Sequence, residues 1–535
     1  KTACPAHIAV QGYLKLAAQG KYREALQLIK RENPFPAVCG RICNRRCEDA
    51  CTRGTVDQAV AIDEVKRFIA QQDLDAATRF VPEKVIPKVD GEFDQQIAVI
   101  GGGPAGLSCA YYLAEKGYRP TVFEKEQRLG GMLENGLPSF RLEKDVVRAE
   151  IDVLREMGVQ FRCGVEVGKD VTIAQLRQEG FRGFYVAVGL QSGGKLDIPG
   201  GDAQGVMAGI DFMRQVNGGQ CSKLAGPVVV IGGGNIAADV ARTAVRCGAE
   251  SVDLYCLEGY DEMPMGAEDR GECERDGITI HAGWGQTEVV TRDGHAAGIR
   301  FRKCLRVKDD QGRFAPVFDD NDACEAACAT VLYCIGQKVD WRQLLTGTAV
   351  TFNPNGTAQV DPVTYQTAEP DIFAGGDAVT GQKFAIDAIA AGKEGAISLH
   401  RFVQKATLTI GRNRRRFVEL DKENALIPVG FDNTPRQRIG YNEALRRTFR
   451  DERVAFTAEQ VQKETARCLS CGASVVDPNK CIGCGVCTTK CAFDAIHLHR
   501  ERPECTNMIP SEDKMKAILP YMVKRQIKIR KARKK

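Results

Sequence analysis

The chain has 535 residues, of which 43% are hydrophobic and 27% are charged. This length exceeds what one hydrophobic core supports and predicts roughly three to five domains, while the composition excludes a disordered or fibrous protein. The net charge of +5 is concentrated in residues 524–535, which hold eight lysines and arginines, so the charge pattern elsewhere does not indicate nucleic-acid binding. The longest uncharged run, 97–114, contains Gly-Gly-Gly-Pro and does not predict a membrane span.

Cysteine is the strongest compositional signal, with 22 residues in the chain. Many of them stand two or three residues apart, and this spacing suits metal clusters better than disulfide bridges. The printed sequence shows no signal-peptide pattern either. We therefore expect reduced thiols and a cytoplasmic location.

Residues 1–92 are predicted to form a helical iron–sulfur domain. Four cysteines recur every fourth residue after an upstream Cys-Pro, and the five candidate ligands are Cys4, Cys39, Cys43, Cys47 and Cys51. On one straight helix the last four would span about 18 Å, too far for one cluster unless the chain bends. The expected set is Cys43, Cys47 and Cys51 with Cys4, and Cys39 is the reserve. A zinc site is the alternative, although zinc favours paired Cys-x2-Cys ligands.

Residues 93–195 and 341–403 are predicted to form a dinucleotide-binding domain. A short apolar strand, 96–100, runs into a glycine-rich loop that opens a helix, with candidate residues Gly101, Gly103, Pro104, Ala105 and Gly106. In this motif the glycines allow a tight turn, a close approach of pyrophosphate and tight helix–strand packing. Glu124 ends the next strand, where a carboxylate can bind a ribose hydroxyl.

The sequence near Asp377 identifies the expected dinucleotide as FAD. Residues 372–377 read Ile-Phe-Ala-Gly-Gly-Asp and resemble the second flavin motif of flavoproteins with two dinucleotide domains. In those proteins the aspartate binds the ribityl–phosphate region, and the helix that follows points its N-terminus at the flavin ring. Further cofactor-binding candidates are Gly131, Met132, Leu133, Arg141, Gly189, Gly336, Gly376, Asp377 and Ala388.

Residues 196–340 are predicted to form a nested nicotinamide-binding domain. The strand 228–231 leads into a second glycine-rich loop with candidates Gly232, Gly234, Asn235 and Ala237. The next strand ends in Cys256-Leu257-Glu258, where NADPH-selective relatives usually place arginines. Because Glu258 would repel a 2′-phosphate, we expect NAD(H), although Arg242 or Arg246 could still serve NADP(H).

The remaining chain is predicted to comprise a surface arm (404–463), a ferredoxin-like 4Fe–4S domain (464–505) and a basic tail (506–535). The tail is expected to be a solvated or disordered arm, and docking to an acidic partner is the alternative. The ligand candidates of the ferredoxin-like domain are Cys468, Cys471, Cys481, Cys484, Cys487, Cys491 and Cys505. In bacterial ferredoxins the fourth cysteine of such a run serves the other cluster. We therefore expect Cys481, Cys484 and Cys487 in one cluster and Cys491 with Cys468 and Cys471 in a second, and Cys505 is the only spare cysteine nearby.

These motifs, in this order, resemble the small (β) subunit of bacterial glutamate synthase and its relatives. The relatives include the large subunit of ferredoxin–NADP transhydrogenases and the N-terminal half of dihydropyrimidine dehydrogenase. The resemblance covers about residues 1–400 and rests also on Asn33-Pro34-Phe35-Pro36, Cys39-Gly40-Arg41-Ile42-Cys43 and Glu262-Met263-Pro264. The family often has a further Cys-x2-Cys pair before Cys4, and the ferredoxin-like C-terminus is not part of the glutamate synthase subunit.

The resemblance implies a helical iron–sulfur domain ahead of two Rossmann-like domains, one for FAD and a nested one for NAD(P). With the C-terminal cysteine run, the expected fold is α/β and ends in a small ferredoxin-like α+β domain. We expect an oxidoreductase with FAD, a nicotinamide and two to three 4Fe–4S clusters. No catalytic side chain is predicted, because the cofactors carry hydride transfer. The expected partner is another redox subunit or ferredoxin in a hetero-oligomeric complex. The alternatives are an electron-relay subunit with an unused nicotinamide site and a zinc-bearing structural protein.

Overall fold

The computed structural model describes residues 3–83, 93–412, 421–422, 430–471, 481–490, 496–498 and 509–532. It divides into two units, 1–471 and 472–535. Cys491 and Cys505 lie outside the described residues. Among the residues that the structure describes, no helix is both long enough and apolar enough to cross a bilayer.

The N-terminal region is helical, as predicted. Its helices are α1 Val10–Ala18, α2 Tyr22–Lys30, α3 Pro36–Ile42, α4 Arg46–Asp49 and α5 Ile62–Ala70, with short 3-10 turns η1 Thr52–Thr55 and η2 Gln71–Leu74. Helix α3 ends at Ile42, and Arg45 adopts a left-handed conformation (φ 55°) before α4 begins. The four regularly spaced cysteines therefore do not share one straight helix.

The first α/β domain is a parallel five-stranded sheet in the order β15-β4-β1-β2-β3. Its strands are β1 Gln96–Ile100, β2 Thr121–Glu124, β3 Gln160–Cys163, β4 Phe181–Val186 and β15 Ile372–Ala374. Its helices are α6 Pro104–Glu115, α7 Met132–Asn135, α8 Lys144–Glu156, α9 Ile173–Gln178, α13 Asp377–Thr380 and α14 Ala385–Val403. The sheet brings β1 and β15, whose first residues are 276 positions apart, into one layer on either side of β4.

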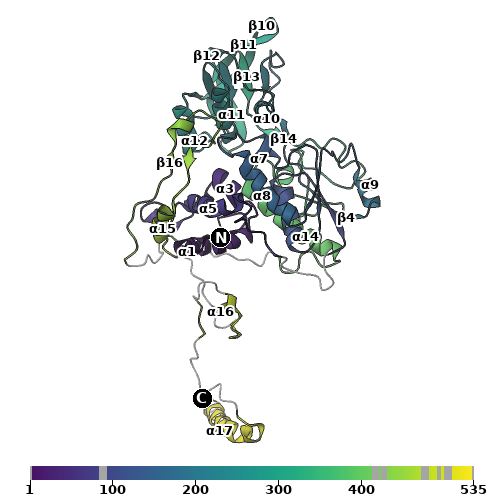
Figure 1. Cartoon of the computed structure of the whole chain (residues 1–535), viewed down its shortest axis with the longest axis vertical. Helices are drawn as coiled ribbons and strands as arrows, with labels where there is room; N and C mark the ends of the chain where they lie inside the picture. Colours follow the sequence, from purple (N-terminus) through teal and green to yellow (C-terminus); the bar gives the residue numbers. More distant parts are fainter. Residues whose placement is uncertain are drawn as a thin grey trace. The chain divides into compact units, whose positions relative to one another are not determined.

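The second α/β domain repeats this plan with a parallel sheet in the order β6-β13-β7-β8-β9. Its strands are β6 Val206–Ala208, β7 Val228–Ile231, β8 Val252–Cys256, β9 Thr279–Ala282 and β13 Thr330–Tyr333, and its helices are α10 Gly209–Asn217, α11 Asn235–Arg246 and α12 Ala267–Arg275. An antiparallel sheet of β10 Trp284–Arg292, β11 His295–Lys308 and β12 Phe314–Ala327 lies beside it (Figure 1). Strands β5 Ser192–Gly193 and β14 Gln337–Lys338 pair where the chain enters and leaves this domain.

Residues 430–471 pack against the rest of the first unit. They contain β16 Gly440–Tyr441, η3 Glu443–Leu445, β17 Arg453–Val454 and α15 Ala458–Ala466, and α15 contacts α1 and α5 (Figure 1). Glu464 and Arg467 in this segment are fully buried. The segment, which includes the last part of the expected surface arm, is therefore an integral part of the first unit.

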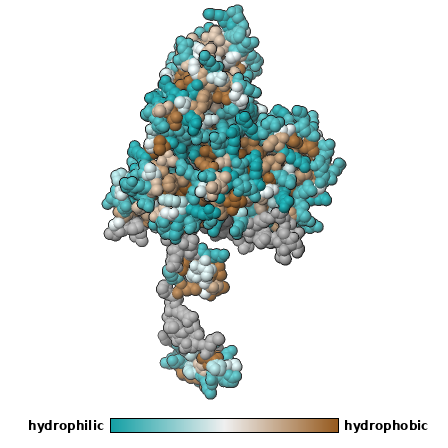
Figure 2. Space-filling model, viewed as in Figure 1, coloured by the Kyte–Doolittle hydropathy of each residue, from teal (hydrophilic) through white to brown (hydrophobic). Residues whose placement is uncertain are grey.

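The second unit contains α16 Val486–Lys490, η5 Ser511–Asp513 and α17 Lys514–Ala532 among its described residues. The basic tail, expected to be a solvated or disordered arm, thus includes an exposed 19-residue helix and not a disordered segment there. Its lysines, arginines, methionines and alanines all favour helix, which explains this difference. Exposed apolar and basic residues alternate over the surface of α17 (Figure 2).

Candidate functional site

The first glycine-rich loop turns sharply between β1 and α6. Gly101 has a φ of 107°, and a Cβ at this position would lie 2.5 Å from the Ala187 carbonyl oxygen. A Cβ at Gly106 would lie 2.0 Å from the Gly101 carbonyl oxygen. Both positions therefore require glycine, and they hold the N-terminus of α6 at the end of the sheet.

Glu124 lies at the end of β2, directly beside this loop. Its carboxylate accepts hydrogen bonds from the backbone N–H groups of Gly102 (2.7 Å) and Glu126 (2.9 Å). Burial raises the pKa of Glu124, whereas these two hydrogen bonds lower it. The carboxylate is thus fixed at the position from which it can accept a hydrogen bond from a ribose hydroxyl.

A cavity of about 860 Å³ opens at the carboxyl end of the first sheet. It is lined by sixteen of the twenty cofactor-binding candidates: Gly101, Gly103, Pro104, Ala105, Glu124, Gly131, Met132, Leu133, Arg141, Gly189, Gly234, Asn235, Gly336, Gly376, Asp377 and Ala388. Residues from both glycine-rich loops therefore face one cavity. An open α/β sheet binds its ligand at this edge.

Four candidates do not line the cavity, and each has another place in the structure. Gly106 and Gly232 are in the tight turns of the two loops, where a Cβ at Gly232 would lie 2.5 Å from the Cys334 carbonyl oxygen. Ala237 is buried in α11. Glu258 follows β8 and approaches the second loop, with Oε2 2.9 Å from the position of a Cβ on Gly233.

The flavin motif near Asp377 is built on close backbone contacts. A Cβ at Gly375 would lie 2.1 Å from the Tyr185 hydroxyl, and Gly376 has a φ of 70°. Burial raises the pKa of Asp377 to about 6, and the carboxylate accepts a hydrogen bond from the Lys383 backbone N–H (3.3 Å). The first residues of α14 also line the cavity, so the positive end of this helix faces its interior.

Arg141 has partners that the sequence did not indicate. Its guanidinium forms ion pairs with Asp239 (2.6 Å) in α11 and Asp269 (2.5 Å) in α12, both from the nested domain. Burial lowers the pKa of Arg141, but the two carboxylates outweigh this and raise it. The residue therefore joins the two α/β domains at the cavity wall.

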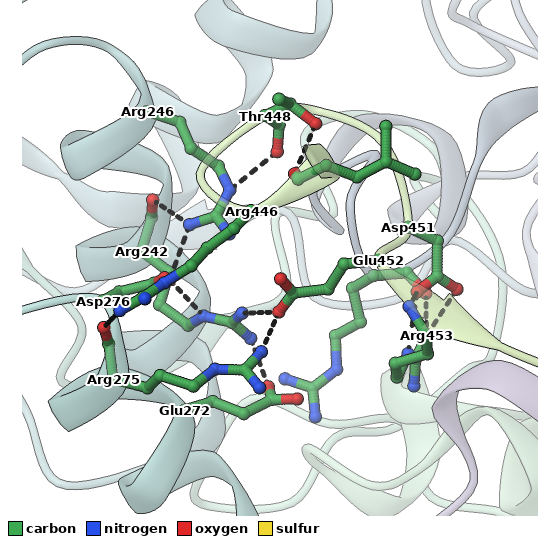
Figure 3. Close-up of polar contacts among 12 residues, drawn as sticks. Arg242, Arg246, Glu272, Arg275, Asp276, Arg446, Thr448, Asp451, Glu452 and Arg453 are labelled. Atoms are coloured by element: carbon green, nitrogen blue, oxygen red, sulfur yellow. Dashed lines mark hydrogen bonds and ion pairs between the residues drawn. The ribbon is translucent and has the colours of Figure 1, made fainter. Parts of the chain in front are cut away.

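The two arginines considered for a 2′-phosphate are already engaged in ion pairs. Arg242 Nε and Arg246 Nη1 both donate to Asp276 Oδ2, at 2.8 Å and 2.6 Å (Figure 3). Arg246 Nε also donates to the Thr448 carbonyl oxygen at 2.8 Å. In Figure 3 both side chains point toward Asp276, at the place where residues 446–453 join the nested domain.

Strand β17 and the residues before it link three parts of the first unit. Arg453 donates to the carbonyl oxygens of Arg41 (3.1 Å) and Arg141 (2.8 Å), and it pairs with Asp451 (Figure 3). Glu452 pairs with Arg275 in α12. The helical domain, the cavity wall and the nested domain are therefore held together by one segment.

The N-terminal cysteines lie close enough for their charges to interact. Burial raises the pKa of Cys39, Cys43 and Cys47, and the Cys43 thiolate contributes to the shifts of the other two. Cys4 contributes to the shift of Cys43. Among the described side chains, no three Cys, His, Asp or Glu residues converge as ligands of a single metal ion.

A buried lysine accompanies these thiols. Lys66 Nζ lies 2.5 Å from Asp63, and burial lowers the pKa of Lys66 while Asp63, Cys43 and Cys39 raise it well above its usual value. Buried thiols with raised pKa values need a cation or a metal to become thiolates. The donor set of several half-buried thiols beside a fixed ammonium suits an iron–sulfur cluster, whose irons each take one thiolate.

The fold and site define a flavin- and nicotinamide-binding oxidoreductase with iron–sulfur domains. Residues 95–392 match the pyridine nucleotide-disulphide oxidoreductase family, and the chain belongs to this family. Residues 1–78 match dihydropyrimidine dehydrogenase domain II, which holds a 4Fe–4S cluster, and residues 474–497 match a 4Fe–4S binding domain. These matches confirm the predicted fold class and the predicted resemblance.

Three curated proteins illustrate the relationship. The NADP(+)-dependent formate dehydrogenase subunit beta of Moorella thermoacetica is 34% identical over 497 residues, 88% of this chain and 69% of that protein. The putative oxidoreductase YgfK of Escherichia coli is 31% identical over 95% of this chain but only 47% of its own length. The glutamate synthase [NADPH] small chain of Halomonas elongata is 32% identical over 73% of this chain and 85% of its own length.

Among solved structures, FprA, a Mycobacterium tuberculosis oxidoreductase, has a TM-score of 0.51 at 16% identity. The match covers 70% of this chain and 99% of FprA. At this identity the likeness concerns the fold alone.

Proposed function

We propose that this chain exchanges a hydride between NAD(P)H and FAD and passes single electrons through 4Fe–4S clusters to or from a partner redox subunit or ferredoxin. The observation that carries this proposal is that Gly103 of the first loop and Gly234 of the second line the same cavity. A nicotinamide on the second loop can then extend toward a flavin on the first. When bound, FAD supplies the step between electron pairs and single electrons.

The backbone geometry of the cavity suits FAD. A Cβ at Gly131 would lie 2.9 Å from the Gly103 Cα, so the two glycines leave an open cradle where a pyrophosphate approaches the N-terminus of α6. Glu124 would bind the ribose hydroxyls, and Asp377 would hold the ribityl chain. The N-terminus of α14 favours negative charge at the flavin ring.

We propose NAD(H) as the preferred nicotinamide. Glu258 lies beside Gly233 of the second loop, where its carboxylate would repel a 2′-phosphate. Arg242 and Arg246 are committed to Asp276, so neither is free for such a phosphate. The opposing consideration is that the relatives from Moorella thermoacetica and Halomonas elongata carry NADP or NADPH in their names.

The partner is proposed from the relatives as well as from the chain. Two relatives are named beta subunits, those of NADP(+)-dependent formate dehydrogenase and of NADPH-Fe(3+) oxidoreductase. We propose that this chain likewise works with a second redox subunit.

Anaerobic titration tests the function. Purified protein is mixed with NADH or NADPH in separate experiments, and flavin absorbance and the iron–sulfur signals are recorded. Bleaching of the flavin by NADH, with electrons reaching the clusters, supports the proposal. An unchanged spectrum with both nicotinamides would contradict it and favour a relay subunit with an unused nicotinamide site. The control variant Gly271→Ala, at a position with open space in α12, should behave like wild type.

A further inference from the structure

Cys468 and Cys471 stand outside both iron–sulfur family matches, which cover 1–78 and 474–497. The structure places them in the first unit, immediately after α15, whereas Cys481, Cys484 and Cys487 belong to the second unit. Both cysteines therefore lie in the first unit, and the residues around them indicate what they bind.

The chain before Cys468 is fixed on the N-terminal domain by Arg467. This arginine is fully buried, and its guanidinium pairs with Asp57 (3.0 Å) and donates to the Gln58 carbonyl oxygen (2.7 Å). It also pairs with Glu464 at 2.7 Å, a carboxylate that accepts a hydrogen bond from the Ala61 backbone N–H (2.7 Å). A buried, fully paired network of this kind holds its neighbours in one arrangement.

The network brings the pair next to Cys51. Arg53, two residues after Cys51, donates to the Arg467 carbonyl oxygen at 3.2 Å. Cys51, Cys468 and Cys471 are each partly buried. On the other side, the Gln11 amide in α1 donates to Cys471 Sγ at 3.7 Å. Three half-buried thiols from two distant parts of the sequence thus meet beside α1.

The backbone at Cys468 repeats the geometry found at Cys43. Arg45 and Ser470 each follow the cysteine by two residues, and both have a positive φ, 55° and 53°. In each case the backbone N–H of that residue donates a hydrogen bond to the cysteine sulfur. Non-glycine residues rarely adopt this conformation, and successive N–H groups turned to one point form an anion-binding concavity found at many iron–sulfur sites.

We propose that Cys51, Cys468 and Cys471 bind one iron–sulfur cluster in the body of the protein. Each thiolate of such a cluster binds a different iron, so the three sulfurs need not converge as they would on a single ion. The Gln11 amide lies close enough to stabilise the charge on Cys471. The proposal groups Cys468 and Cys471 with Cys51, whereas a two-cluster ferredoxin would group them with another C-terminal cysteine. It does not depend on the proposed hydride transfer.

The test uses the full chain purified anaerobically, with Cys51→Ser, Cys468→Ser and Cys471→Ser compared with wild type and with Cys221→Ser, an isolated cysteine. Iron, sulfide and flavin are quantified, and dithionite-reduced samples are examined by electron paramagnetic resonance. Each of the three variants should lose the same signal and about four irons per flavin. The double variant Cys51→Ser/Cys468→Ser should lose no more than either single variant. Cys481→Ser should remove a different signal.

The proposal is overturned if Cys468→Ser and Cys481→Ser lose the same signal, or if Cys51→Ser loses iron that Cys468→Ser and Cys471→Ser keep. Alkylation of the wild-type protein provides a second measurement that needs no variant to fold. The three cysteines should be protected together from iodoacetamide and become reactive together when a chelator removes iron. If Cys468 reacts while Cys51 stays protected, the three thiols do not share a cluster. Flavin reduction by NADH is recorded separately, so a failure of the proposed function would appear without loss of this signal.

Discussion

Arg141 and Asp239 form an ion pair 2.6 Å long between the wall of the flavin cavity and helix α11 of the nested domain. Asp269 in α12 binds the same guanidinium. Because the arginine belongs to one α/β domain and both carboxylates to the other, the ion pairs determine how the two glycine-rich loops face each other across the cavity.

Replacing Arg141 by methionine should therefore destabilise the protein. Asp239 and Asp269 would stay buried without a partner, which costs about 3–5 kcal/mol for a broken buried pair. Urea unfolding would measure this loss, and flavin reduction by NADH should also slow. The control Arg306→Met removes an exposed arginine paired with the exposed Asp310 and should cost less than about 1 kcal/mol. Equal stability of the two variants would show that the bridge contributes little.

A matched pair of valine substitutions should separate the two nucleotide loops. Gly103 (φ −84°) and Gly234 (φ −99°) both have backbone conformations open to other residues, so valine should fill the cavity rather than strain the chain. Gly103→Val should retain its iron but hold below about a tenth of the wild-type flavin. Gly234→Val should keep its flavin and lose reduction by NADH. Full flavin occupancy in Gly103→Val, measured by absorbance against iron, would refute the first assignment.

Nicotinamide preference is expected to follow Glu258. Wild type should favour NADH, and the double variant Glu258→Ala/Cys256→Arg should move toward NADPH because it exchanges a negative charge for a positive one. Steady-state kcat/KM with each nicotinamide measures the change. A wild type that already favours NADPH by about tenfold, or about 1.4 kcal/mol, would show that this interpretation of the end of β8 is wrong.

Two truncations that differ by eight residues should behave differently. Deletion of 472–535 should leave flavin reduction by NADH intact, because both glycine-rich loops lie in the first unit. It should slow electron delivery to the natural partner, since a buried flavin needs a relay to reach another protein. If delivery continues at the full rate, electrons leave through the N-terminal clusters instead.

Deletion of 464–535 should in addition destabilise the helical domain. It removes Glu464 and Arg467, whose hydrogen bonds reach Ala61, Asp57 and Gln58. Limited proteolysis of residues 1–78 would detect this loosening, and equal protection in both truncations would contradict it.

The raised pKa of Asp377 predicts that the stability of the flavin-free protein depends on pH. Its folded pKa of about 6 lies above the ordinary value of 3.8, so between these values the folded state keeps a proton that the unfolded chain has released. Stability should therefore fall as pH rises through this window. Asp377→Asn, which cannot titrate, should flatten the slope of the melting temperature against pH relative to wild type. An identical slope would show that other groups cause the dependence.

Local features of the chain were predictable from sequence because they depend on neighbouring residues. The strands predicted at 96–100 and 228–231 are β1 and β7, and the glycines after them form the turns that the motif requires. A short apolar run followed by glycines specifies a strand, a positive-φ turn and a helix start without help from distant residues. The order of these motifs was enough to predict the fold class and the family.

Which cysteines lie together was decided by tertiary structure, and so were the partners of Arg141 and the anchoring of residues 430–471. Spacing suggested that Cys468 belongs with Cys491, which lies outside the described residues. The described structure links the residues before Cys468 to those after Cys51, more than 400 residues earlier in the chain, through the hydrogen bond from Arg53 to the Arg467 carbonyl oxygen. Arg467 makes this possible through buried hydrogen bonds to backbone carbonyls, and a carbonyl oxygen is present at every residue, so no sequence pattern marks it as a partner. Sequence spacing shows which thiols are close along the chain, whereas buried ion pairs between distant segments determine which thiols lie together in the folded protein.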